Sequence, residues 1–197
     1  MPDMSSHGKH RPLAAGAWRA AERRLILDCS PWLRVWEEKV TLPNGHRIES
    51  YLITRERDYA MVFALTDDGR VPLVRQYKHG AGKPMLDLPA GYLDEEETPV
   101  ACAQRELLEE TGYVCAHWLA LASGVIDSNR GMTRAHLFLA TGGSRVSAPQ
   151  LDDTEDLICT LHTLEELRTM VRSGAIESLA SITGILLALD RLATDQR

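Results

Sequence analysis

The first half of the chain alternates apolar with polar residues over short stretches, which is the spacing of half-buried β-strands. Residues 32–40 alternate loosely, and residues 47–54 form a second such run. Between them, Asn44-Gly45 is typical of a tight turn, so the two runs predict a β-hairpin. Apolar runs predict further strands at residues 59–65, 71–77 and 85–88.

A helix is predicted from Pro99 to Thr111, where no residue breaks a helix. Thr98 is a favourable N-cap, and Pro99 suits the first helical position because the N–H that it lacks would have no helical partner there. Gly112 supplies the left-handed residue that ends many helices. The helix would be about 20 Å long.

Two more helices are predicted towards the C-terminus. Thr163 and Glu166 form a capping box, which opens a helix that stops at Gly174. Apolar residues then recur at helical spacing over residues 179–189, which predicts an amphipathic helix packed on a core. Strands are predicted before these helices at residues 115–123, 133–140 and 157–162.

The order of these elements predicts an α/β fold in which a mixed β-sheet lies between helical layers. The 197 residues suffice for one core with a small appendage. We therefore expect an N-terminal tail and β-hairpin region over residues 1–57 and a main domain over residues 58–197. Hydrophobic residues at 44% and charged residues at 25% are ordinary for a soluble globular protein.

The net charge of −6 argues against a dedicated nucleic-acid-binding protein, which needs a basic face. It does not argue against a nucleotide substrate, because bound metal supplies local positive charge. No apolar run is long enough for a membrane span, and the polar N-terminus does not resemble a signal peptide, so no membrane partner is expected. Four scattered cysteines without C-x-x-C spacing fit a cytoplasmic protein: Cys29, Cys102, Cys115 and Cys159.

Three glutamates share one face of the predicted helix. Glu106, Glu109 and Glu110 stand at positions i, i+3 and i+4, so their side chains are neighbours. Their repulsion becomes useful if a cation binds among them, and oxygen ligands suit Mg²⁺ or Mn²⁺. Such ions polarise a phosphoryl oxygen and prepare a water for attack. Taken alone, this pattern is more often a solvated acidic surface.

Four residues at fixed distances favour the catalytic interpretation. Five residues separate Gly91 from Glu97, seven residues separate Glu97 from Arg105, and Gly112 is the last of the four. The stretch 91–113 resembles the Nudix box, G-x5-E-x7-R-E-U-x-E-E-x-G-U with U bulky and apolar, and fills every fixed position. The resemblance implies a hydrolase of nucleoside diphosphates that are linked to another group.

Outside the box, the chain is similar to the ADP-ribose pyrophosphatase-like branch of the Nudix hydrolases. The similarity covers about residues 30–192 and implies the Nudix fold. In that branch the N-terminal region helps to build a homodimer whose active sites take residues from both chains, so residues 1–57 are expected to be a dimerisation element. The similar segments are 74–78 (V-R-Q-Y-K), 86–91 (L-D-L-P-A-G), 154–158 (T-E-D-L-I) and 164–167 (L-E-E-L).

The branch implies metal-dependent attack of water on one phosphorus of a diphosphate. ADP-ribose is the first expected substrate, giving AMP and ribose 5-phosphate, and GDP- and UDP-sugars are close alternatives. Two departures leave the sugar open. Residues 126–131 lack the proline that the branch usually carries in this region, and Asp87 stands where the branch often has glutamate.

The resemblance also implies roles for the carboxylates. Glu106 and Glu110 are expected to be the main metal ligands, Glu109 to bridge or support them, and the Ala90 carbonyl to be a further ligand. Arg105 is expected to pair with a carboxylate such as Glu97 and orient it.

The general base of this branch lies in the late acidic loop, which points to Asp153 or Glu155, with Glu155 also a candidate metal ligand. Neighbouring negative charge in that loop would raise the pKa of a carboxylate towards neutrality, which suits a base. The alternative is a solvated acidic turn.

Candidate substrate-binding residues are cationic or aromatic. The cations would hold the diphosphate or the terminal sugar, and a tyrosine would stack on the base, although such residues are more often surface charges or packing residues. The candidates are Arg75, Lys78, Arg130, Arg134 and Tyr51.

Two other functions stay open. A dinucleoside polyphosphate or nucleoside triphosphate hydrolase is disfavoured by the N-terminal hairpin and the late acidic loop. A catalytically inactive Nudix module that senses a nucleotide should lack a box glutamate, and this chain retains all of them.

Overall fold

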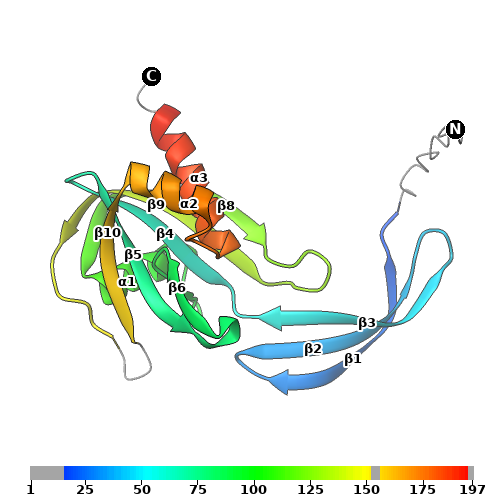
Figure 1. Cartoon of the computed structure of the whole chain (residues 1–197). Coiled ribbons are helices and arrows are strands. Elements are labelled where there is room, and N and C mark those ends of the chain that lie inside the picture. Colours follow the sequence, from blue (N-terminus) through cyan, green and yellow to red (C-terminus); the bar gives the residue numbers. More distant parts are fainter. Residues whose placement is uncertain (1–15, 152–155, 195–197) are drawn as a thin grey trace, which may run out of the picture. The chain divides into compact units, whose positions relative to one another are not determined.

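The computed structural model describes residues 16–151 and 156–194, and the chain divides into two compact units, residues 1–55 and 56–197 (Figure 1). The first unit holds a three-stranded sheet in the order β1-β2-β3. The predicted hairpin is confirmed, since β2 and β3 are neighbours and Gly45 in the turn between them has a φ of 83°, which glycine adopts without strain. The strands are β1 (Arg19–Cys29), β2 (Leu33–Thr41) and β3 (Arg47–Glu56).

The alternation of apolar and polar residues does not predict β1. This strand pairs antiparallel with β2, but the register shifts between Ala20 and Glu22 and again between Leu25 and Leu27. Such irregularities break the period of two by which strands are recognised. Every residue of β1 is also exposed within this chain, so burial marks neither of its faces.

The second unit holds two sheets among its described residues. One has the strand order β7-β4-β9-β8, in which β4 and β9 are parallel and the other neighbours antiparallel, so it is a mixed sheet as expected. The other has the order β10-β5-β6 and is antiparallel. The bounds are β4 (Tyr59–Thr66), β5 (Arg70–Lys78), β6 (Lys83–Asp87), β7 (Ala90–Tyr92), β8 (Tyr113–Val125), β9 (Arg134–Arg145) and β10 (Leu157–Thr163), with a 3-10 turn η1 (His79–Ala81).

The first two helices of the second unit begin and end at the predicted residues, and the last begins at the predicted Leu179 but continues to Thr194. The helices are α1 (Pro99–Thr111), α2 (Leu164–Ser173) and α3 (Leu179–Thr194). Thr98 caps α1 by accepting a hydrogen bond from the Ala101 N–H at 3.3 Å. Gly112 ends α1 with a φ of 75°, and a Cβ there would lie 2.1 Å from the Ser147 carbonyl oxygen, so only glycine fits. None of the helices in residues 16–151 and 156–194 is long and apolar enough to cross a membrane.

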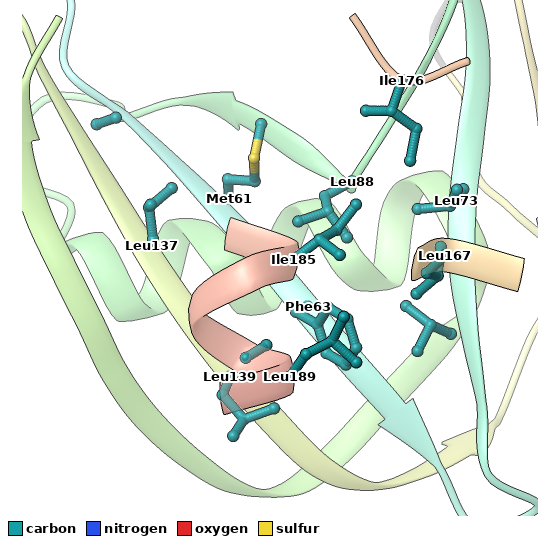
Figure 2. Packing of buried hydrophobic residues seen from close by; sticks show 13 residues of the cluster. Met61, Phe63, Leu73, Leu88, Leu137, Leu139, Leu167, Ile176, Ile185 and Leu189 are labelled. Atoms are coloured by element: carbon teal, nitrogen blue, oxygen red, sulfur yellow. The ribbon is translucent and has the colours of Figure 1, made fainter. Parts of the chain in front are cut away.

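Strand β4 faces a different helical layer on each side. Successive residues of a strand point to opposite faces. Val62 packs with Leu107 of α1, while Phe63 packs with Ile185 and Leu189 of α3 (Figure 2). The predicted sheet between helical layers is therefore confirmed, and the apolar stripe of α1 fixes the helix that carries the three box glutamates.

Candidate active site

Helix α1 buries two of its three box glutamates. Leu107 is fully buried, and its neighbours Glu106 and Glu110 are only 7% and 4% exposed. The Glu109 side chain stays 41% exposed. A buried carboxylate is costly unless cations or hydrogen-bond donors stand beside it. A solvated acidic surface therefore does not describe Glu106 and Glu110.

Arg105 connects the loop before α1 to the glutamates of α1. Its Nε and Nη2 donate to the two oxygens of Glu97, each at 3.0 Å. Its Nη1 donates to Glu106 at 2.7 Å and to Glu109 at 3.1 Å. One guanidinium thus orients three carboxylates, and the sequence predicts its pairing with Glu97.

The charges in this network shift two pKa values, and burial shifts a third. Hydrogen bonds from Arg105 hold the pKa of Glu97 below its ordinary value. Hydrogen bonds to Glu97, and then to Glu106, raise the pKa of Arg105. Burial raises the pKa of the Cys102 thiol to about 12, so this cysteine stays protonated and donates to the Gly91 carbonyl at 3.4 Å. The shifts of Glu97 and Arg105 therefore both favour the charged form of the group.

Gly91 makes room for Glu106. A Cβ at position 91 would lie 1.8 Å from Oε1 and 2.0 Å from Cδ of the Glu106 side chain. No side chain can occupy that space while Glu106 keeps its place. The first glycine of the box is thus explained by the carboxylate that packs on its backbone.

The Ala90 peptide lies against Glu110. The N–H of Ala90 donates to Oε2 of Glu110 at 3.0 Å, and Ala90 pairs with Met61 at the start of β7. This contact brings a backbone segment with the proposed carbonyl ligand to the helix that carries the glutamates. The role of the Ala90 carbonyl as a metal ligand stays a prediction.

Arg57 is a second arginine of the site, and sequence reasoning does not find it. Its Nε donates to the Leu93 carbonyl at 3.0 Å, and Nη2 bonds Asp94 at 2.9 Å. The guanidinium also lies 5.6 Å from the centre of the Tyr92 ring. Arg57 therefore fixes the loop between Gly91 and α1. No motif spacing links it to the box.

The Nudix domain family matches residues 55–181 of the chain. The chain belongs to the Nudix family. An ADP-ribose pyrophosphatase from Mycobacterium tuberculosis (strain ATCC 25618 / H37Rv) is 31% identical over 153 residues, which cover 76% of this chain and 72% of that protein.

Two further similarities fit this membership. The methanol dehydrogenase activator of Bacillus methanolicus is 31% identical over 140 residues, which cover 71% of this chain and 75% of that protein. The crystal structure of an ADP compounds hydrolase matches with a TM-score of 0.80 and 18% identity, covering 92% of this chain and 97% of that one, which shows the same fold. The expected Nudix fold is confirmed, and the chain is a Nudix hydrolase that acts on phosphoric anhydrides.

The chemistry of the donors in this Nudix site fits a divalent metal. Among the described residues, no three histidine, cysteine or acidic side chains are gathered closely enough to hold an ion as they stand. Glu106 and Glu110 nevertheless present hard oxygen donors from successive turns of α1, and both are buried. Arg105 donates to Oε1 of Glu106 at 2.7 Å and the Ala90 N–H donates to Oε2 of Glu110 at 3.0 Å, so both carboxylates are held in place.

The candidate substrate-binding residues lie outside the network around Arg105. Arg75 lines a cavity of about 270 Å³ together with residues of β6, Ala175 and Glu177. Lys78 bonds Gln76 at 2.6 Å. The backbone N–H of Arg130 donates to Asp127 at 3.3 Å, and the Arg134 guanidinium donates to the Ser123 hydroxyl at 3.1 Å and its carbonyl at 2.9 Å. Tyr51 belongs to the first unit and packs edge-on against Trp18 at 5.8 Å.

The two candidate bases, Asp153 and Glu155, lie outside the described residues. Two backbone hydrogen bonds connect the chain before them to the C-terminal end of α1. The Gln150 N–H donates to the Glu109 carbonyl at 2.7 Å, and the Val146 N–H donates to the Gly112 carbonyl at 2.9 Å. The C-terminal end of α1 therefore fixes the chain at Val146 and Gln150.

Proposed function

We propose that this Nudix hydrolase cleaves the diphosphate of a nucleoside-diphosphosugar, with ADP-ribose as its first substrate and AMP and ribose 5-phosphate as products. The observation that carries the proposal is the network in which Arg105 orients Glu97, Glu106 and Glu109 while the Ala90 peptide holds Glu110. The ADP-ribose pyrophosphatase named among its relatives supports the choice of substrate.

Glu106, Glu110 and the Ala90 carbonyl are the proposed ligands of Mg²⁺ or Mn²⁺. A divalent ion held by these residues would polarise a phosphoryl oxygen, lower the pKa of a water and neutralise the leaving phosphate. Glu109 is the most exposed of the three box glutamates, which suits a bridging or supporting role. Arg105 keeps the Glu106 and Glu109 carboxylates in place by charge-assisted hydrogen bonds.

In the proposed reaction a water oxygen bonds to one phosphorus, and the bond from that phosphorus to the bridging oxygen breaks. The bridging oxygen leaves with the electron pair as part of the other phosphate. The proposed base, Asp153 or Glu155, accepts a proton from the attacking water, and Glu155 is also a proposed metal ligand. The bond from Gln150 to the Glu109 carbonyl supports this role, because it fixes the chain near α1 two residues before the acidic segment begins.

Residues 1–57 are the proposed dimerisation element of a homodimer. Three apolar side chains of β1 support this role, because burying them against a second chain would be favourable. They are Leu25, Ile26 and Leu27, each 43–47% exposed. Arg75, Lys78, Arg130, Arg134 and Tyr51 remain proposed contacts of the diphosphate, the sugar or the base. The four cysteines are free, which supports a proposed cytoplasmic location. Neither nucleic acid nor membrane is a proposed partner.

A substrate panel tests the proposal. ADP-ribose, GDP-mannose, UDP-glucose, NADH and diadenosine polyphosphates are each incubated with the protein and Mg²⁺, and the products are identified by chromatography and mass spectrometry. We expect the highest kcat/KM for ADP-ribose, with AMP and ribose 5-phosphate as products. Preferred cleavage of diadenosine polyphosphates would instead support the alternative hydrolase, and binding without turnover of any substrate would support the nucleotide sensor.

Glu110→Gln tests the metal ligands in the same assay. The variant keeps the size of the side chain and its ability to accept from Ala90, so it should melt close to the wild-type temperature, while turnover falls by orders of magnitude. Glu165→Gln, at an exposed position of α2, is the matched control and should not change the rate. Near-normal activity of Glu110→Gln would contradict the metal assignment.

A further inference from the structure

Ser181 of α3 and Asp87, the last residue of β6, form a buried pair beside the segment that leads into the Nudix box. The Ser181 hydroxyl donates to Oδ1 of Asp87 at 2.8 Å, and the two residues are 0% and 8% exposed. The same hydroxyl oxygen accepts the Leu88 N–H at 3.2 Å. One serine thus satisfies a buried carboxylate and a buried backbone amide.

Helix α3 contacts Leu88 a second time. A Cβ at Gly184 would lie 2.9 Å from Cδ1 of Leu88, so the helix backbone and this side chain are in close contact. Leu88 is 1% exposed, and Figure 2 shows it beside Ile185. Helix α3 therefore fixes both the backbone and the side chain of Leu88.

The segment from Asp87 to Ala90 connects the residues that α3 holds to Glu110. The Pro89 carbonyl accepts the Val62 N–H at 3.0 Å, and the next residue, Ala90, donates its N–H to Glu110 at 3.0 Å. Proline has a fixed φ, so the segment has little freedom once its two ends are bound. The Ala90 peptide is thus held by its pairing with Met61 of β4 at one end of the segment and by the contacts of Ser181 with Asp87 and Leu88 at the other.

We propose that Ser181 and Asp87 are positioning residues that set the Ala90 peptide against Glu110 and thereby raise the metal affinity of the site. This inference rests on the proposed function, which assigns Glu110 and the Ala90 carbonyl as metal ligands. Ser181 and Asp87 act through Ala90 and make no contact with substrate in this scheme. Loss of a hydrogen bond that orients a metal ligand typically costs about 10–100-fold in metal affinity.

Four variants separate positioning from plain stability. Ser181→Ala and Asp87→Ala each remove the hydrogen bond between α3 and the box segment. Asp87→Asn keeps a side-chain oxygen that accepts the Ser181 hydroxyl, but removes the charge. Leu189→Ala weakens the packing of α3 two turns further along the same helix, where Leu189 belongs to the hydrophobic core, and leaves the pair untouched.

The readout is Mn²⁺ affinity, measured by the electron paramagnetic resonance signal of free Mn²⁺, together with the melting temperature without metal. We expect Ser181→Ala and Asp87→Ala to weaken Mn²⁺ binding about tenfold or more. Asp87→Asn should stay within about threefold of wild type because the hydrogen bond remains. Leu189→Ala should lower the melting temperature and keep the wild-type affinity.

Three outcomes would overturn the proposal. One is wild-type Mn²⁺ affinity in Ser181→Ala. The second is an equal loss in Asp87→Asn and Asp87→Ala, which would make the charge and not the hydrogen bond the active feature. The third is an equal loss in Leu189→Ala, which would reduce the effect to general destabilisation.

Glu110→Gln, measured in the same titration, separates this inference from the proposed function. If Glu110→Gln binds Mn²⁺ as tightly as wild type, the metal site itself is misassigned. If Glu110→Gln loses affinity while Ser181→Ala does not, the metal site stands and the positioning role of Ser181 fails.

Discussion

Both oxygens of the Glu97 carboxylate accept hydrogen bonds from Arg105, Nε to Oε1 and Nη2 to Oε2, each at 3.0 Å. This bidentate pair joins the loop before α1 to the second turn of the helix. It leaves Nη1 of Arg105 to bond Glu106 and Glu109. The planar, forked guanidinium is therefore needed as a whole, which explains why the box has arginine at this position.

Arg105→Lys should lower kcat for ADP-ribose by about tenfold or more, because a single ammonium group cannot bond both oxygens of Glu97 and still orient Glu106. Steady-state kinetics on the purified variant provide the measurement. Arg168→Lys is the control, since Arg168 makes one 3.4 Å contact with Glu165 on the surface of α2, and it should retain the wild-type rate. A kcat of Arg105→Lys within about twofold of wild type would show that the forked geometry is dispensable.

Gly91→Ala should abolish most activity, because the new Cβ would lie 1.8 Å from Oε1 of Glu106 and force this carboxylate out of its place. We expect kcat to fall by about 100-fold or more and Mn²⁺ affinity to fall with it. Displacing a proposed metal ligand would cause both losses. The kcat and the Mn²⁺ affinity are measured on the same preparation.

Gly124→Ala is the matched control for this change. Gly124 lies in β8, where an added Cβ meets nothing within 4 Å. Both variants replace a glycine with alanine, so an effect that comes only from the lower backbone flexibility would appear in both. Full activity in Gly91→Ala would mean that Glu106 can move without loss, and would exclude it as a fixed ligand.

The parts of the site that are local in sequence could be predicted, and those that depend on distant contacts could not. Thr98, Pro99 and Gly112 fix the ends of α1 through their own backbone chemistry, so the helix follows from the sequence. The spacing of the box likewise predicts that Arg105 pairs with Glu97.

Arg57 and Ser181 reach the site from far along the chain. Arg57 bonds the Leu93 carbonyl across 36 residues, and Ser181 bonds the Leu88 N–H across 93 residues. No spacing pattern in the sequence reveals such contacts, because they form only when the chain before β4 and helix α3 pack beside the box. Both residues look ordinary in the sequence, one in a charged stretch and the other in a helix of apolar residues.

Asp153→Asn and Glu155→Gln, compared side by side, should identify the general base. The variant that removes the base should lower kcat by about 100-fold or more and change KM little, because it removes proton transfer and not binding. If Glu155 is instead a metal ligand, Glu155→Gln should also weaken Mn²⁺ binding. Unchanged rates in both variants would exclude this acidic segment from catalysis.

The lowered pKa of Glu97 predicts a specific dependence of stability on pH. Hydrogen bonds from Arg105 are the main cause of the shift, and the ordinary value is 4.5. Because the folded pKa lies below the unfolded one, the unfolded state binds more protons as the pH falls. The stabilisation from Glu97 is therefore fully present above the unfolded pKa and is lost as the pH falls through the folded pKa.

Glu97→Gln removes this linkage, and urea denaturation between about pH 7 and about pH 3 measures the result. The free energy of unfolding of the variant should be lower than that of wild type at neutral pH, and it should decline less steeply below an ordinary carboxyl pKa. Glu95→Gln, at an exposed position of the same loop, is the control and should follow the wild-type slope. Parallel curves for Glu97→Gln and wild type across this range would mean that the bond from Arg105 does not favour the charged form of Glu97, and that its value to the protein lies in geometry alone.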